Sequence, residues 1–263
     1  MSLYRWFLYD EPAWPTLRVD HLAEWLRERF PSHEVRVRSH LAEGTPADPY
    51  RREEALQQWA RLWAEAKVFR PDERVEAPSP LSGEIEYERR RLLQRHRPLF
   101  GIVYDGEWLQ AGLRAFLPPQ ERRLSDLHIL FTGQLLATFD EGDLRYHLRT
   151  LIIGFPTLIS LTGMVEAPAK PREYYFLRSL RLDDPRVWER PSEKWLVHHD
   201  ERLTEVAKGF LLQAAFYQWL GEAFCQDSHC RLFNAHWQEE LLQAQLGGPY
   251  ELCPRHRELF KKL

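Results

Sequence analysis

The sequence predicts an α/β fold in which a mixed sheet packs against long helices. Three observations indicate it. A strand, a helix and a strand follow one another within the first forty residues, which is typical of a parallel βαβ unit. Apolar runs typical of buried strands then alternate with amphipathic helical patterns along the chain. Finally, 263 residues with 44% hydrophobic and 13% aromatic side chains supply a large core. We expect one domain over 1–263.

The first part of the chain, residues 1–70, is predicted to form the βαβ unit and one further helix. Aromatic or alternating residues fill its strands, and apolar residues repeat every three or four positions in its helices. Pro31 ends the first helix. The predicted elements are a strand at 4–9, a helix at 19–30, a strand at 33–40 and a helix at 51–69. Prolines then mark 71–84 as an exposed connection.

The middle part, residues 85–220, is predicted to supply the rest of the sheet and a long helix. LHILFT at 127–132 is typical of a central strand. Gly154 and Pro156 break the apolar run 147–165, and because proline cannot donate to a ladder we expect a strand, a bend and a second, partly exposed strand. The other predicted elements are an arginine-rich helix at 86–97, a strand at 100–104, a helix at 107–117, an irregular excursion at 133–145, a strand or short helix at 174–182, a helix at 201–220 ended by Gly221 as a left-handed C-cap, and a helix at 234–246.

The C-terminal part, residues 221–263, holds all three cysteines and is predicted to be a subdomain stapled by a metal. Cys225, Cys230, Cys253 and His256 form the pattern Cys-x4-Cys-x22-Cys-x2-His. Two close pairs of soft or borderline ligands separated by a helix-sized insert are typical of a closed tetrahedral zinc site. Four protein ligands leave no position for water, so we expect one structural Zn²⁺.

Spacing alone leaves alternatives to this site open. A local disulfide between Cys225 and Cys230, or three cysteines buried as small apolar residues, would leave no metal site. His229 or His236 would replace His256 as the fourth ligand. We favour the metal site with His256. An odd number of cysteines confined to one segment also indicates metal binding in a reducing cytoplasm and not a disulfide framework.

Composition and motifs argue against several function classes. A net charge of −3 gives no general signal for nucleic acid or a membrane surface. We expect neither a signal peptide nor a membrane span, since no stretch of about 18 apolar residues occurs. No nucleophile elbow, phosphate loop or dinucleotide fingerprint is present. The arginine-rich helix at 86–97 also carries glutamates at helical spacing. We therefore interpret its basic face as solvated and ion-paired, and we do not expect nucleic acid as the partner. Its arginines are Arg89, Arg90, Arg91, Arg95 and Arg97.

The cysteine segment resembles the archaemetzincins, a family of zinc metallopeptidases. Their motif runs His-Glu-x-x-His-x-x-Gly-x-x-His-Cys-x4-Cys-x-Met and later Cys-x-x-Cys. Laid on this chain without a gap, it places its glycine at Gly221 and three cysteines at Cys225, Cys230 and Cys253. LHILFT, IIGF and LISL also stand in the order of the elements that precede the active-site helix in that family. The resemblance covers roughly 127–256 and implies a metzincin-like mixed sheet.

The resemblance does not extend to the catalytic residues. In the intact motif three histidines hold a catalytic zinc and the glutamate acts as general base. Alanine, glutamine and phenylalanine supply neither, which excludes that mechanism at this helix. His256 is the obvious replacement for the missing cysteine. This chain has Ala214 in place of the first histidine, Ala215 in place of the glutamate, Gln218 in place of the second histidine and Phe224 in place of the third. Leu232 takes the position of the methionine, and Tyr250 that of the penultimate cysteine.

The sequence therefore predicts a catalytically degenerate archaemetzincin-like protein that binds a peptide or protein partner. The resemblance implies that residues 158–161 form an edge strand along the former substrate cleft, where a partner would add as a strand near helix 210–220. The alternative is a divergent metallohydrolase with a relocated metal on His236 and Glu239 and one of His147, His198 or His199. A weaker alternative is a nucleic-acid-associated protein that uses the arginine helix. The sequence names neither the ligand nor the oligomeric state.

Overall fold

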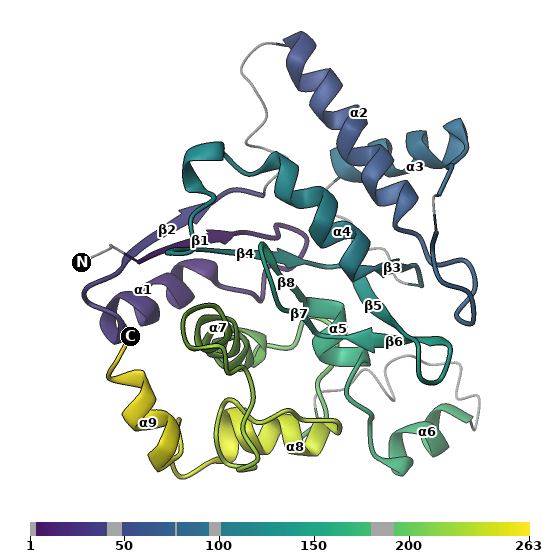
Figure 1. The fold of residues 1–263 in the computed structure, drawn as a ribbon. Coiled ribbons are helices and arrows are strands. Elements are labelled where there is room, and N and C mark those ends of the chain that lie inside the picture. Colours follow the sequence, from purple (N-terminus) through teal and green to yellow (C-terminus); the bar gives the residue numbers. More distant parts are fainter. Residues whose placement is uncertain (1–3, 41–48, 77, 95–100, 180–191) are drawn as a thin grey trace.

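The computed structural model describes residues 4–40, 49–76, 78–94, 101–179 and 192–263, and it confirms the α/β class. A five-stranded sheet and a three-stranded sheet are surrounded by helices (Figure 1). None of the described helices is long and apolar enough to span a membrane. The helices are α1 (Val19–Arg29), α2 (Pro49–Glu65), α3 (Ser82–Leu93), α4 (Gly106–Leu113), α5 (Leu161–Glu166), α6 (Arg172–Ser179), α7 (Leu203–Leu220), α8 (Gln238–Leu242) and α9 (Pro254–Phe260).

The main sheet has the strand order β2-β1-β4-β8-β7. Its strands are β1 (Arg5–Tyr9), β2 (Glu34–Arg38), β4 (Asp126–Thr132), β7 (Leu151–Ile152) and β8 (Thr157–Ser160). The first four strands in this order are parallel and β7 runs antiparallel to β8. The predicted parallel βαβ start is confirmed, because β1 and β2, which precede and follow α1 in the chain, pair in parallel. The predicted central strand is also confirmed, since every residue of β4 is buried.

Successive residues of β1 serve two different cores. Trp6 and Leu8 join the cluster that includes residues of α1 and α7, whereas Phe7 and Tyr9 join the cluster that includes residues of α2 and α4. This follows from the two-residue period of a strand, which sends neighbouring side chains to opposite faces. Figure 1 accordingly shows α2 and α4 on one side of the sheet and α1 and α7 on the other.

The strand at the edge of the main sheet is not the one that the resemblance implied. β8 pairs with β4 on one side and β7 on the other, and all four of its residues are buried. The expectation of a partly exposed edge strand at 158–161 is therefore wrong. Gly154, with φ 149°, and Pro156 lie in the bend that turns the chain back. Because of this reversal, β7, which comes from the first apolar run, pairs with β8, which comes from the second. β7 is therefore the edge strand.

A second sheet replaces the predicted irregular excursion at 133–145. β5 (Leu135–Asp140) and β6 (Arg145–Arg149) form an antiparallel hairpin, and β3 (Val103–Asp105) pairs in parallel with β5. The acidic residues Asp140, Glu141 and Asp143 lie at or next to the turn of this hairpin. β3 comes from a segment some thirty residues earlier, so local sequence gave no sign of the pairing.

The helix predicted at 234–246 begins later than expected. α8 starts at Gln238 and continues as a π-helical turn at Gln243–Gly247. The Glu240 carboxylate accepts hydrogen bonds from the backbone N–H groups of His236 and Trp237, at 2.9 and 3.1 Å. These contacts cap the helix and keep the preceding residues outside it.

The arginines of α3 pair with neighbouring glutamates, as the sequence predicted, but the face is not solvated throughout, because Glu88 is fully buried and the Arg91 side chain is only 9% exposed. Arg89 and Arg90 both donate to Glu86 at 2.7 Å, and Arg91 donates to Glu88 at 2.6 Å. Arg95 and Arg97, which were assigned to the same helix, lie outside the described residues. The segment predicted as a strand or helix at 174–182 is helical in α6, and its last residues also lie outside the described part.

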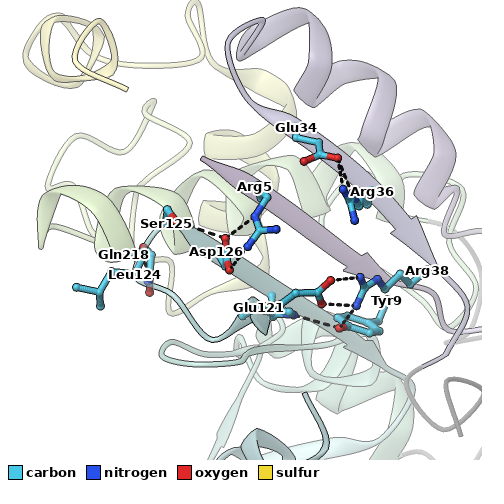
Figure 2. A network of polar contacts seen from close by, with 11 residues as sticks. Arg5, Tyr9, Glu34, Arg36, Arg38, Glu121, Leu124, Ser125, Asp126 and Gln218 are labelled. Atoms are coloured by element: carbon cyan, nitrogen blue, oxygen red, sulfur yellow. Dashed lines mark hydrogen bonds and ion pairs between the residues drawn. The ribbon is translucent and has the colours of Figure 1, made fainter. Parts of the chain in front are cut away.

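Two bidentate ion pairs lie at the β1, β2 and β4 side of the sheet, one between β1 and β4 and one between β2 and the 3-10 turn at Pro119–Glu121 (Figure 2). Arg5 donates to the fully buried Asp126 at 2.7 and 2.6 Å, and Arg38 donates twice to Glu121 at 2.7 Å. Arg5 and Asp126 are also register partners between β1 and β4. The pair therefore favours this register, since a slip would leave a buried carboxylate without its partner.

Gly221 ends α7 in the left-handed region, with φ 74°, and its N–H donates to the Tyr217 carbonyl at 2.9 Å. The predicted C-cap is thus confirmed. We expect Gly221→Ala to lower the free energy of unfolding by about 1 kcal/mol, because L-residues disfavour positive φ. A Cβ at this position would meet nothing within 4 Å, so the backbone conformation alone accounts for the cost.

Gly83 in α3 provides a matched control, since its added Cβ also meets nothing within 4 Å and its φ is not positive. Gly83→Ala should stabilise the protein by up to about 1 kcal/mol. Urea denaturation of both variants measures the two changes. Shifts of the same sign would contradict the assignment of a special backbone role to Gly221.

Candidate metal centre

Cys225, Cys230, Cys253 and His256 converge so that one ligand atom from each lies within 4.8 Å of the others. Cys225 Sγ lies 3.8 Å from Cys253 Sγ, and His256 Nδ1 lies 3.9 Å from Cys230 Sγ and 3.1 Å from Cys253 Sγ. A tetrahedral ion with Zn–S bonds of about 2.3 Å would place its sulfur ligands about 3.8 Å apart. None of the four residues is more than 8% exposed. The donor set and its spacing fit a closed tetrahedral ion.

The first pair of ligands is held by a compact loop after α7. The backbone N–H of Cys225 donates to the Leu232 carbonyl at 2.8 Å, and the N–H of Cys230 donates to the Asp227 carbonyl at 3.0 Å. These bonds fold the loop back on itself, so both sulfurs point to one centre.

The second pair lies at the start of α9. Cys253 is the N-cap, Pro254 follows at the first helical position, and His256 stands in the first turn. Proline suits this position because the helix needs no N–H there. Residues three apart share a helix face, which brings the sulfur and the imidazole together.

Backbone N–H groups point at two of the sulfurs. The N–H of Asp227 donates to Cys225 Sγ at 3.3 Å, and the N–H of Cys253 donates to Cys230 Sγ at 3.5 Å. Such bonds favour thiolates. Burial acts against them, raising the pKa of Cys225 and raising the pKa of Cys230 to about 12. A bound cation would supply the charge that buried thiolates need.

His256 is suited to be a neutral ligand. Burial lowers the pKa of its imidazole, which keeps a lone pair available. Nδ1 faces the sulfurs, and Nε2 lies 4.0 Å from a carboxylate oxygen of Glu222. Arg255 holds that carboxylate through a 2.6 Å hydrogen bond. At 4.0 Å, Nε2 and the Glu222 carboxylate are not hydrogen-bonded, and Nε2 has no hydrogen-bond partner among the described residues.

The structure also distinguishes among the alternatives that the sequence left open. All three cysteines are free, so no local disulfide joins Cys225 and Cys230. His229 is 3.6 Å from Asp227 and its side chain is 44% exposed. His236 is exposed and lies outside the cluster. Of the candidate histidines, the geometry brings His256 to the sulfurs.

Comparison with known proteins adds the family. A family model described as "Probable metallopeptidase family (DUF6775)" matches residues 2–263. The chain belongs to this family. No curated protein and no solved structure matches it.

In this member of the probable metallopeptidase family, α7 carries none of the ligands of the archaemetzincin motif. Ala214 and Ala215, at the positions of the first histidine and the glutamate, are fully buried in the core. Gln218 donates to the Leu124 carbonyl at 3.0 Å, and both residues are seen in Figure 2. Phe224 is 46% exposed and is apolar. These four positions supply no imidazole and no carboxylate.

A relocated metal site on His236 and Glu239 finds no support among the described residues. His236 precedes α8, so the two residues do not share a helix face, and neither belongs to a group of three potential ligands. His147 is 2.8 Å from Asp143, in a largely exposed group with Asp140. His198 is 3.2 Å from Glu166, and His199 lies against the Trp14 ring, with centroids 4.6 Å apart.

A groove of about 350 Å³ lies between the edge of the main sheet and α7. Leu151 and Ile153 contribute from the edge segment, Phe210 and Gln213 from α7, and Phe224 from the cysteine loop. The sequence predicted the edge strand at 158–161 and not at β7, so these residues were not identified as lining a groove. The bend at 154–156 was the sequence signal that the two apolar segments on either side of it pair in antiparallel fashion.

Proposed function

We propose that this chain is a non-catalytic relative of zinc peptidases that binds an extended peptide or protein segment and carries one structural Zn²⁺. The groove beside the edge strand β7 carries this proposal. Its α7 wall is formed by Phe210 and Gln213, and Phe224, at the position that the third histidine of the related peptidases takes by resemblance, lines the groove as well. Binding without hydrolysis is the function that these residues support best.

Zinc is the metal that the donor set favours. Three sulfurs and one imidazole form a soft tetrahedral set, which suits Zn²⁺ better than the oxygen-preferring Mg²⁺ or Ca²⁺. All four positions are taken by buried protein atoms, so a structural role is favoured over a catalytic one. The ion would tie the loop after α7 to the start of α9.

Strand addition is the mode of binding that the groove favours. β7 is the last strand in the order of the main sheet, and edge strands pair readily with extended segments. The facing wall offers Phe210 and the half-exposed Phe224 to apolar side chains of the partner. At about 350 Å³, the groove is large enough for a small group of side chains.

Purified wild-type protein should hold one zinc per chain by ICP-MS, and Cys253→Ser should lose it. Because metal binding contributes folding free energy, we expect the variant to lose at least about 3 kcal/mol, which corresponds to a fall in Tm of roughly 10 °C. His229→Ala, in the same loop but outside the cluster, should keep both zinc and Tm. A wild-type protein without metal, or an unchanged Tm for Cys253→Ser, would refute the structural site.

Selection from a displayed library of random peptides should enrich extended, apolar sequences. Phe224→Ala should weaken the Kd of an enriched peptide about tenfold, since it removes an exposed aromatic side chain of the groove. Phe69→Ala is the control, because Phe69 is 73% exposed and lies outside the groove. The two variants should have the same Tm.

The same peptide tests the non-catalytic part of the proposal. Its mass should be unchanged after prolonged incubation with the zinc-loaded protein. Cleavage that EDTA abolishes would show that the chain is a peptidase after all. Equal weakening by both phenylalanine variants would instead exclude this groove as the binding site.

A further inference from the structure

A second cavity, of about 470 Å³, is bordered by α5, α6 and the segment before α7. It lies apart from the cysteine cluster and shares Leu148 with the groove described above. Much of its wall is apolar, which favours a ligand with a hydrophobic group. The apolar side chains are Leu135, Leu148, Val165, Leu196 and Val197.

A buried lysine lines this cavity. Lys170 is only 4% exposed, its ammonium group lies 3.3 Å from Glu166 Oε1, and the centroid of the Tyr174 ring is 4.3 Å away. An ammonium group has three N–H donors, and one carboxylate oxygen at this distance does not use them all. A buried lysine is costly to maintain without a compensating role.

Among the described residues that line the cavity, Glu166 carries the one carboxylate, and two donors already share it. His198 Nε2 lies 3.2 Å from the same Oε1 atom of Glu166 that Lys170 contacts. Burial alone would raise the pKa of Glu166, but the hydrogen bond from His198 and the charge of Lys170 lower it to about 2. Glu166 is therefore ionised and engaged, and it leaves little attraction for another cation.

The remaining charge at the cavity is positive. Arg178 also lines it, is exposed, and forms no ion pair with any described residue. Among the described lining residues, two basic side chains thus face one carboxylate. A guanidinium group presents parallel N–H donors that match a carboxylate in a bidentate arrangement.

We propose that this cavity binds a small carboxylate that carries an apolar group. Arg178 and a remaining N–H of Lys170 hold the carboxylate, and the leucine and valine wall receives the apolar group. Two sources share this chemistry, a free carboxylic acid and the free C-terminus of a peptide. The inference does not depend on the zinc site or on peptide binding at β7.

The test compares N-acetyl-leucine with N-acetyl-leucinamide by isothermal titration calorimetry at pH 7 and low salt. The two probes differ only at the carboxyl end, which is an anionic acceptor in the acid and a neutral group with N–H donors in the amide. The acid should bind at least about tenfold more tightly than the amide, and Arg178→Gln should remove that difference. Arg172→Gln, an exposed arginine on the same helix but outside the cavity, should leave it intact.

A tetrapeptide ending in leucine, with a free or amidated C-terminus, separates the two sources. Preference for the free C-terminus would support a peptide end as the ligand, and binding of N-acetyl-leucine alone would support free acids. Equal affinity for acid and amide, no binding of either at 10 mM, or an unchanged preference in Arg178→Gln would overturn the proposal. Because Arg178 is exposed, its replacement tests binding without endangering the fold.

Discussion

The burial of α7 between the main sheet and the C-terminal segment is the constraint on which the rest of the structure depends. Its middle, from Gly209 to Phe216, is buried on all sides, so the helix is apolar around its whole circumference. Gly209 allows the close approach of the π turn, since a Cβ there would lie 2.0 Å from Gln245 Oε1. Gln245 in turn donates to the Arg231 carbonyl in the cysteine loop, at 3.0 Å.

This packing accounts for the alanines at the positions that align with the archaemetzincin motif. Ala214 and Ala215 are fully buried among apolar side chains. A histidine and a glutamate there would each bury a polar group without a partner, at a cost of a few kcal/mol. The helix that aligns with the catalytic helix of the archaemetzincin motif is a core helix in this chain, and the Cys3His donors are the ones that would hold the C-terminal segment in place.

The groove and the cavity are both consequences of how the chain passes the edge of the main sheet. The reversal between β7 and β8 brings Leu151 and Ile153 opposite α7, which forms the groove. The helix α5 then carries Glu166 away from the sheet, towards Lys170 and His198. The groove is lined largely by apolar side chains, and the cavity carries Lys170 and Arg178, so the two suit chemically different ligands.

Much of the fold followed from local pattern. The βαβ start, the buried strand β4, the long helix and its Gly221 cap were all predicted, because each depends on residue periodicity or on one special backbone conformation. The association of Cys225, Cys230 and Cys253 with His256 was also predicted, since few combinations other than metal binding bring such residues together at that spacing.

Non-local contacts decided the remainder. The β5–β6 hairpin with its partner β3, the edge position of β7 and the start of α8 after His236 all depend on pairings between distant segments. The convergence of Glu166, Lys170 and His198 depends on them as well. The sequence by itself determined the βαβ start, β4, α7 and its cap, and which residues have ligand chemistry. Only the tertiary structure decided which strand is left at the edge and which charged groups share a cavity, because these are fixed by burial and pairing that no local window contains.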